Sequence, residues 1–171
     1  MPAALKGPRV QRVAKSRLTA GAAGAALMAL VTVTVGGFEG VRYKAYLPTP
    51  NDVPTLCFGE TRGVKMGDTA TPAQCREMLG LALQDFAAGI EICMVSPEII
   101  PAKTYAASLS LAYNIGQTAF CRSTVLRHLN AGKFRQACDG FLAWNKQKGK
   151  VLAGLTRRRQ EERALCLEGA G

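Results

Sequence analysis

Six cysteines constrain the fold of this 171-residue chain more than any other feature of its sequence. They are dispersed through the chain at positions 57, 75, 93, 121, 138 and 166, and no two of them form a CxxC pair. Because His128 is the only histidine, the thiols lack the partners that commonly complete a zinc site. An even number of dispersed cysteines is typical of disulfides formed in an oxidising compartment, and six cysteines allow fifteen pairings. The alternative is a cytosolic protein with six buried thiols; the sequence indicates no metal and no cofactor.

The N-terminal part of the chain favours export. Residues 1–17 form a basic stretch that precedes the first acidic residue, Glu39, and residues 18–37 then carry no charge. Twenty helical residues at about 1.5 Å each would just cross a bilayer core of about 30 Å. Basic residues before such a segment predict that the N-terminus stays in the cytoplasm while the rest of the chain is exported.

The uncharged segment is weakly hydrophobic, since ten of its twenty residues are Ala or Gly and three are Thr. Three interpretations are open: a cleaved signal peptide, a stable transmembrane anchor, and a marginal anchor that can leave the membrane. No A-x-A cleavage site follows the segment cleanly, and its hydrophobicity is low for a permanent anchor. The composition fits a marginal anchor best. We therefore predict a basic cytoplasmic stretch (1–17), a signal-anchor (18–37) and one exported domain (38–171).

The remaining sequence predicts a mainly α-helical α+β domain. Thr71, Pro72 and Gln74 have the pattern of a capped helix start, and apolar residues at helical spacing continue to about Ile92. Similar spacing predicts helices over 102–115, where Gly116 ends the pattern, and over 123–130, 134–146 and 154–167. Residues 41–67 are rich in Gly, Pro and Thr, which indicates turns and a sheet of two or three strands. The expected architecture is a small β lobe next to a helical lobe.

Glu39 is the first candidate for chemistry. It follows directly on the apolar run that ends Gly36-Gly37-Phe38. Apolar surroundings disfavour the charged form of a carboxyl group, and a protonated carboxyl can donate to the leaving oxygen of a glycosidic bond. A glutamate after an apolar helix is more often a solvated helix end, so the surrounding motifs decide between the two interpretations.

Those motifs resemble the phage-type lysozymes, glycoside hydrolase family 24. GFEGVRYKAYLPTPNDVPTLCFGETRG (37–63) is similar to the active-site stretch of that family, which has the pattern E-G-x-R-x-x-A-Y, then an Asp, then P/W-T, then a G-x-G or C-x-G turn. The resemblance continues through LAYNIGQTAFCRSTVLRHLNAG (111–132), the segment from Ala137 to Trp144, and GLTRRRQEERALC (154–166). Several motifs in the same order make the resemblance specific, and it implies a phage-lysozyme-like fold.

The resemblance implies roles for three residues of the first motif. Glu39 matches the general acid, and Thr55 matches a threonine that helps to place the attacking water. The family aspartate usually stands nine residues after the glutamate, but Pro48 occupies that position here. Asp52 is the only carboxylate of the loop. Either it replaces the family aspartate, or it is a turn residue and the site works with Glu39 and Thr55 alone.

Further positions match substrate-binding residues of the family. Tyr113 and Asn114 correspond to an aromatic and polar pair that lines the cleft, and Ser123 or Thr124 corresponds to a hydroxyl that contacts substrate. Aromatic rings stack on sugars, and amides and hydroxyls bond to sugar hydroxyl and N-acetyl groups. Helix packing is the alternative for each of these residues, and N-capping is the alternative for Ser123.

Two other matches concern charge. Arg158 stands where the family often has an arginine near the catalytic glutamate, and an ion pair there would fix the rotamer of Glu39. We expect Arg157 and Arg159 to lie on a solvated basic face. Glu60 stands where many relatives have His, so a salt bridge of the family is expected to be absent or rebuilt.

The cysteines match a disulfide-bearing, exported branch of the family, and neighbouring elements suggest the pairs Cys57–Cys75, Cys93–Cys121 and Cys138–Cys166. The N-terminus resembles the signal-anchor-release arm of some phage endolysins, which are exported tethered and inactive and are then freed from the inner membrane. Release is predicted to let residues 18–37 pack against the domain and bring Glu39 into place.

Taken together, the resemblance implies a monomeric periplasmic endolysin that acts on bacterial peptidoglycan and has no nucleic-acid partner. It would hydrolyse the β-1,4 bond between N-acetylmuramic acid and N-acetylglucosamine with inversion. A lytic transglycosylase that uses Glu39 alone is the first alternative, because the family aspartate is missing. A non-catalytic cationic protein that binds the wall or membrane is the second, because the net charge is +10.

Overall fold

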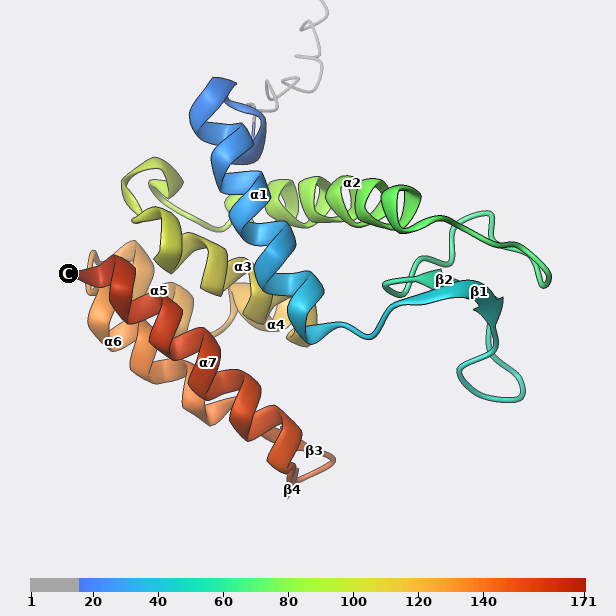
Figure 1. The fold of residues 1–171 in the computed structure, drawn as a ribbon. Helices are drawn as coiled ribbons and strands as arrows, with labels where there is room; N and C mark the ends of the chain where they lie inside the picture. Colours follow the sequence, from blue (N-terminus) through green and yellow to red (C-terminus); the bar gives the residue numbers. More distant parts are fainter. Residues whose placement is uncertain (1–15) are drawn as a thin grey trace, which may run out of the picture.

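The computed structural model describes residues 16–171 and shows a helical lobe joined to a small β lobe (Figure 1). The basic stretch 1–17 lies outside the described residues except for its last two. The elements in chain order are η1 (Arg17–Thr19), α1 (Gly21–Phe38), β1 (Arg42–Tyr46), β2 (Thr55–Cys57), α2 (Pro72–Glu91), η2 (Pro97–Ile99), α3 (Ala102–Ile115), α4 (Gln117–Cys121), α5 (Thr124–Asn130), α6 (Phe134–Asp139), η3 (Gly140–Ala143), β3 (Lys146–Gln147), β4 (Lys150–Val151) and α7 (Ala153–Ala170).

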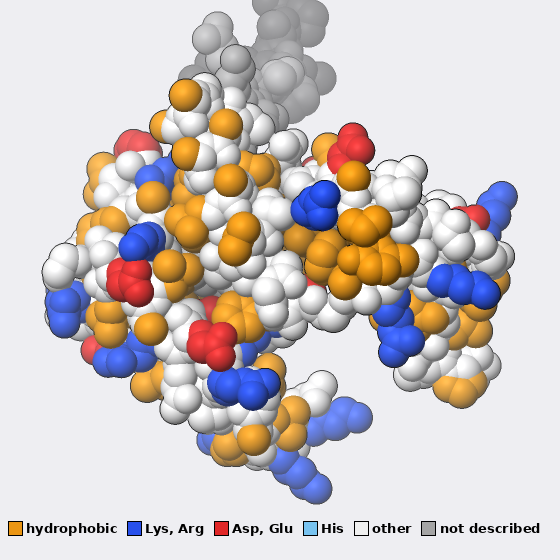
Figure 2. Space-filling model, viewed as in Figure 1, with side chains coloured by type: hydrophobic (Ala, Val, Ile, Leu, Met, Phe, Trp, Pro, Cys, Tyr) orange, Lys and Arg blue, Asp and Glu red, His pale blue; other side chains and the backbone are white. Residues whose placement is uncertain are grey.

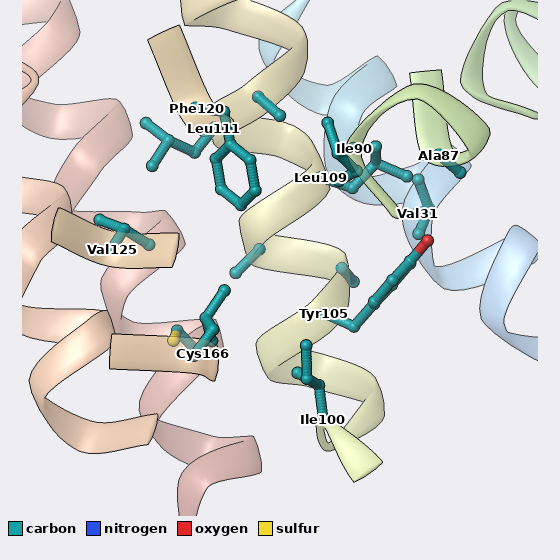
Figure 3. Packing of buried hydrophobic residues seen from close by; sticks show 14 of the residues in the cluster. Val31, Ala87, Ile90, Ile100, Tyr105, Leu109, Leu111, Phe120, Val125 and Cys166 are labelled. Atoms are coloured by element: carbon teal, nitrogen blue, oxygen red, sulfur yellow. The ribbon is translucent and has the colours of Figure 1, made fainter. Parts of the chain in front are cut away.

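The main core surrounds α3. Residues 104–112 of this helix are all buried, because α1, α2 and α7 pack against it. Figure 3 shows the cluster, in which Leu109 and Leu111 of α3 lie among side chains of the neighbouring helices. A helix that is buried on every side needs no amphipathic pattern, and small residues such as Ala106, Ala107 and Ala112 let its neighbours approach closely.

The apolar N-terminal segment forms α1 and belongs to this core. Leu27, Val31 and Val35 recur every four residues, are buried, and lie in one cluster with side chains of α2 and α3. The opposite face is exposed and carries mostly alanines, at positions 22, 23, 25, 26 and 29. α1 is long and apolar enough to cross a membrane by length and composition. The same helix is therefore compatible with a membrane by its composition and with a protein core by one of its faces, which carries Leu27, Val31 and Val35.

The helix α2 links the two lobes. Its start is the predicted capping box: the Thr71 hydroxyl accepts a hydrogen bond from the Gln74 amide (3.2 Å), and the Gln74 side chain accepts one from the Thr71 amide (2.8 Å). Leu79, Leu83 and Ile90 face the core at helical spacing. Local sequence thus set both the first residue of this helix and its buried face.

The β lobe consists of β1 paired antiparallel with β2, and an irregularity in register lies between the pairs Arg42–Cys57 and Tyr46–Thr55. A single bridge between Lys44 and Thr69 adds to this two-stranded sheet. After β2 the chain reverses between Leu56 and Glu60, which exchange backbone hydrogen bonds (2.9 Å each). Cys57 (φ 57°) and Gly59 (φ 100°) both adopt left-handed backbone conformations in this turn. The turn is therefore tight, and it presents Phe58 toward the helical lobe.

Two local predictions need correction. The helix expected over 134–146 ends at Asp139, and the chain continues through η3 into the β3–β4 hairpin. Lys148 (φ 48°) and Gly149 (φ 79°) form the two-residue loop of that hairpin, a turn geometry that matches the twist of paired strands. The short helix α4 was also missed: Gly116 ends α3 with φ 89°, but helix resumes at the next residue.

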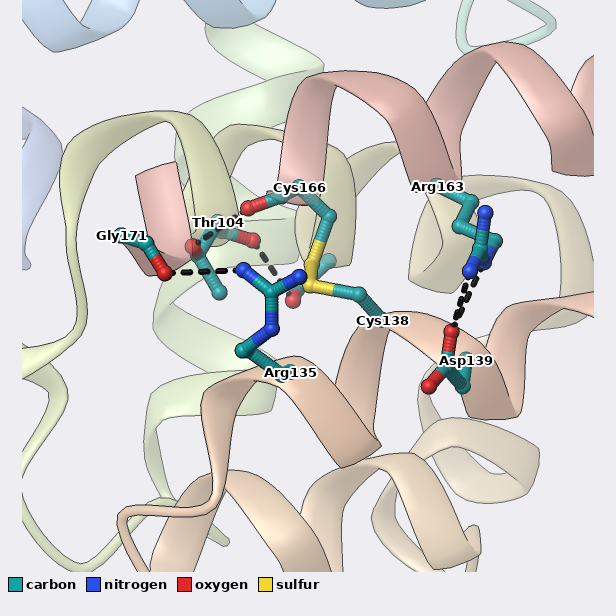
Figure 4. The surroundings of a disulfide bond; sticks show 8 residues. Thr104, Arg135, Cys138, Asp139, Arg163, Cys166 and Gly171 are labelled. Carbon is teal, nitrogen blue, oxygen red and sulfur yellow. Dashed lines mark hydrogen bonds and ion pairs between the residues drawn. A yellow bond between two sulfur atoms is a disulfide. The ribbon is translucent and has the colours of Figure 1, made fainter. Parts of the chain in front are cut away.

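Three disulfides cross-link the two lobes and the helices: Cys57–Cys75, Cys93–Cys121 and Cys138–Cys166. These are the three pairs expected from the sequence. Figure 4 shows the third, which joins α6 to α7 beside the ion pair between Arg163 and Asp139 (2.6 Å). The first fastens the turn after β2 to α2, so it holds the β lobe in place relative to the helix that lines its inner side.

Candidate active site

Glu39 lies at the junction of the two lobes. It is the first residue after α1, where the backbone becomes extended (φ −88°, ψ 130°) and leads into the β lobe. Its amide still donates to the Val35 carbonyl (3.1 Å), so the residue is tied to the last turn of the helix. About a quarter of its side chain is exposed (26%). The carboxyl is thus fixed to a packed helix yet open to solvent.

Arg158 of α7 holds this carboxyl. Its Nη1 donates to Oε1 of Glu39 (2.8 Å), and its guanidinium lies over the Phe38 ring, 4.9 Å from the centroid. Arg158 is itself buried. A buried, stacked guanidinium has few alternative positions, so it restricts the rotamer of Glu39.

A fully buried carboxylate, Glu162, lies behind Arg158. It accepts hydrogen bonds from Arg158 Nε (3.0 Å), Arg159 Nη2 (3.1 Å) and the Ser110 hydroxyl (2.6 Å). Arg159 is also fully buried, so the expectation that it lies on a solvated face was wrong, whereas Arg157 is exposed. Buried charges persist when they are paired. Arg158 and Arg159 stand four and three residues before Glu162 on one helix, and this spacing is the sequence signal of the buried pairs.

Two adjoining pockets form a groove that begins at Glu39. One pocket, of about 600 Å³, is lined by Glu39, Arg42, Tyr46 and the Phe58-Gly59 turn. The second shares Phe58 and Gly59 and continues along α2 and α3 to Glu60, Arg62, Asp85, Phe86, Tyr113 and Gln117. Figure 2 shows the surface hollowed between the β lobe and the helical lobe, with Lys and Arg side chains on both sides. An extended, polar-edged groove suits a chain molecule better than a small compact ligand.

Tyr113 forms part of the groove wall. It is half-buried, and its ring packs on Phe86 with 4.9 Å between centroids. Burial, and then the charges of Glu39 and Glu60, raise the pKa of the Tyr113 hydroxyl, while Arg158 acts in the opposite direction. The Tyr113 hydroxyl therefore lies within the electrostatic reach of Glu39.

Glu60 takes part in a rebuilt ion-pair network. Its carboxylate accepts from the Arg62 side chain (Nε, 3.2 Å) and backbone (2.8 Å), and Arg62 also pairs with Asp85 (3.1 Å). Partial burial acts to raise the pKa of Glu60, but the hydrogen bonds from Arg62 outweigh it and the pKa falls below its ordinary value. The network connects the turn after β2 to α2 across the groove.

Asp52 and Thr55 are engaged within their own segment. Asp52 is exposed, and its carboxylate accepts from the Val53 amide (2.9 Å) and the Thr49 hydroxyl (3.3 Å), as a turn residue does. Thr55 is buried in β2, and its hydroxyl donates to the Val53 carbonyl (3.0 Å). Neither residue lines the two pockets described above.

The remaining candidates lie at different places. Asn114 is exposed beside Tyr113 on α3 and lines neither pocket of the groove. Ser123 caps α5: its hydroxyl accepts from the Leu126 amide (3.1 Å) and donates to the Phe120 carbonyl (2.7 Å). Thr124 follows it and is exposed. Within residues 16–171 no group of His, Cys, Asp or Glu side chains is placed to hold a metal ion.

The chain is similar to known proteins over most of its length. The family model described as "Phage lysozyme" matches residues 36–162. The SAR-endolysin of Bacteriophage PS119 is 39% identical over 137 residues, which are 78% of each chain. The SAR-endolysin of Enterobacteria phage P21 is 36% identical over 162 residues, covering 90% of this chain and 95% of that protein. Among solved structures, a mutant of P22 lysozyme superimposes with a TM-score of 0.72 at 35% identity, covering 80% of this chain and 94% of that one.

Proposed function

The chain belongs to the phage lysozyme family, and on this premise we propose that it is an endolysin that hydrolyses the β-1,4 bond between N-acetylmuramic acid and N-acetylglucosamine in bacterial peptidoglycan. The observation that carries the proposal is the pairing of Glu39 with the buried Arg158 at one end of an extended groove. A carboxyl held in one orientation beside a groove can deliver a proton to a bound glycan.

In the proposed reaction Glu39 protonates the glycosidic oxygen as its bond to the anomeric carbon breaks. Water attacks that carbon from the opposite face, so the configuration inverts, and the proton released by the water passes to a base. Thr55 is proposed to help place this water, and Asp52 is the only carboxylate in residues 47–54 that could take the proton. Inverting enzymes keep acid and base far enough apart for a water molecule to fit between them. Asp52 lies between β1 and β2, so a base there would belong to the β lobe, while the acid stands at the end of α1.

The groove offers contacts for the sugar rings. Tyr113 and Phe86 supply adjoining aromatic surface, and the Glu60–Arg62–Asp85 network supplies polar groups in the same pocket. Asn114 and Thr124 are exposed and available to sugar hydroxyl groups beyond the groove. For Ser123 the capping contacts favour a structural role, so we assign substrate contact there to Thr124 instead.

The products of digestion test the proposed reaction. Purified peptidoglycan treated with the full-length oxidised protein is expected to release muropeptides with reducing ends, seen by mass spectrometry. NMR of the first products is expected to show the anomer opposite to that of the substrate. Anhydro products, lighter by one water, would instead establish a transglycosylase. Failure of the folded protein to release any fragment would favour the cationic binder.

We propose further that the protein is exported to the periplasm as a monomer, tethered at first to the inner membrane by uncleaved residues 18–37. The SAR-endolysin relatives and the apolar helix α1 support this proposal. Cleavage after residue 37 would remove Leu18, Leu27, Val31 and Val35 from the core, so an intact N-terminus agrees better with the packing. While the helix lies in a bilayer, those side chains face lipid, and Glu39 is held at the membrane surface away from Arg158.

A further inference from the structure

The first inference concerns Glu162, which lies outside the groove. We propose that Glu162 is a positioning residue for Glu39: its buried carboxylate fixes Arg158 and offsets part of its positive charge, so that Arg158 orients Glu39 without preventing it from carrying a proton. This inference rests on the proposed role of Glu39 as the acid.

The geometry makes Arg158 a bridge between two carboxylates. Its Nη1 contacts Glu39 (2.8 Å), and its Nε contacts Glu162 (3.0 Å). Its Nη2 lies 3.4 Å from the Ser110 carbonyl. Glu162 is held in turn by the Ser110 hydroxyl and by Arg159 (Nε to Oε2, 2.9 Å). The residues that fix the orientation of the Arg158 guanidinium therefore lie on the side away from Glu39, and they do not line the groove.

The charges of the cluster balance only when Glu162 is counted. Two guanidinium groups, of Arg158 and Arg159, face two carboxylates, of Glu39 and Glu162. Without Glu162, both cations would act on Glu39 alone and favour its ionised form, which cannot donate a proton. The other groups near Glu39 are Tyr113 from α3, Glu60 from the turn after β2, and Arg42, which lines the same pocket. Burial raises the pKa of Glu162, while Arg159, Ser110 and Arg158 act in the opposite direction.

The test is the pH profile of peptidoglycan hydrolysis by the full-length variant Glu162→Gln. Its alkaline limb is expected about one pH unit lower than in the unmodified protein, with kcat at neutral pH reduced about tenfold. KM is expected to stay the same, because Glu162 does not line the groove. Glu161→Gln removes the same charge one residue away at an exposed position and is expected to leave the profile unchanged.

Two more variants separate positioning from stability. Glu162→Asp keeps the charge, so its alkaline limb is expected near the original pH even where thermal stability falls. Arg159→Gln removes one cation, so the alkaline limb of its pH profile is expected at higher pH. If Glu162→Gln does not fold, Arg159→Gln tests the inference in its place. An activity loss in Glu162→Gln that is equal at every pH, or an unmoved limb in Arg159→Gln, would overturn the inference. A failure of the proposed function would look different, because the unmodified protein itself would then give no reducing-end products.

A second, independent observation concerns the residues that precede α1. The Ser16 hydroxyl and the Arg17 amide donate to Oε1 of Glu91, at the end of α2 (3.3 and 3.1 Å), and the Tyr105 hydroxyl donates to the same oxygen. The Arg17 guanidinium donates to the Pro97 carbonyl (2.8 Å) and lies 4.9 Å from the centroid of the Tyr105 ring. The start of the apolar helix is thus bound by a polar site on the exported domain.

The close packing at this point depends on Gly24. A Cβ on Gly24 would lie 2.9 Å from the Leu18 carbonyl oxygen, so only glycine lets η1 fold back against α1 in this way. We infer that the Glu91–Tyr105 site is a receptor for residues 16–17 that is filled only after α1 leaves the membrane. In the tethered form Arg17 lies on the cytoplasmic side and Glu91 on the other. Once filled, the site retains the released helix on the domain.

The variant Glu91→Gln tests this receptor in cells that produce the full chain. After membrane depolarisation, its ratio of soluble to membrane-bound protein is expected to fall about tenfold, since hydrogen bonds to a charged group are the strong ones. Tyr105→Phe, which removes only the hydroxyl, is expected to shift the ratio in the same direction. Glu77→Gln, on an exposed turn of the same helix, is the matched control. Equal partition of Glu91→Gln and Glu77→Gln would overturn the inference.

Discussion

Replacing Glu39 with Gln is expected to slow peptidoglycan cleavage by about 10²–10⁴-fold, because the amide cannot donate the proton that the leaving oxygen needs. The change keeps the shape of the side chain, and the Gln carbonyl can still accept from Arg158, so the fold is expected to survive. Release of reducing ends, measured at several pH values with the full-length oxidised protein, checks the effect. Activity equal to that of the unmodified protein would contradict the assignment of Glu39.

The variants Asp52→Asn and Thr55→Ala test the other two residues of the proposed reaction. A loss comparable to that of Glu39→Gln in Asp52→Asn would make Asp52 the base of the reaction. Near-normal activity would leave Asp52 as the turn residue that its contacts with Thr49 and Val53 describe. Circular dichroism and thermal unfolding of each variant exclude loss of fold as the cause.

The second large effect is expected in α1. Val31→Asn is expected to lower the free energy of unfolding by about 3–5 kcal/mol, because it removes a buried apolar side chain and buries an unpaired amide. For a chain of this size the melting temperature would fall by roughly 10 °C. Val31 is 0% exposed in the core cluster, so the site offers the new amide no water.

Val33→Asn is the matched control for this prediction. Val33 lies on the same helix but is 75% exposed, so the substitution is expected to change the free energy of unfolding by less than about 0.5 kcal/mol. Both variants lower the hydrophobicity of residues 18–37 equally, and their tendency to leave a bilayer should change alike. Thermal unfolding of the soluble full-length proteins compares them directly. Equal melting temperatures would show that α1 is not part of the folded core in solution.

Several features were predictable because they depend on neighbours in the sequence. The start of α2 follows from the Thr71–Gln74 capping box, and its buried face follows from apolar spacing. Glu39 stood out because a specific motif surrounds it, and dispersed cysteines indicated disulfides, which the structure contains. The β3–β4 hairpin was harder, because helix-like spacing continued past Asp139 and a single Lys-Gly pair was the only turn signal.

What the sequence by itself determined is therefore what depends on near neighbours: the main helices, the capped start of α2, and a glutamate, Glu39, at the end of an apolar segment. Tertiary structure decided the surroundings of the apolar N-terminal helix and of the basic start of α7. An Ala-rich helix with a four-residue valine repeat is compatible with lipid or with a protein core, and only α2 and α3 supply the core. Likewise, the Arg-rich start of α7 has the composition of a solvated face. Arg157 is exposed, but Arg158 and Arg159 are buried there, because Glu162 of the same helix pairs with both. Glu39 and Ser110, from two other parts of the chain, contact Arg158. The pairing of both arginines with Glu162 follows a local spacing, but the contacts of Arg158 with Glu39 and Ser110 exist only in the packed chain, and no local pattern encodes them.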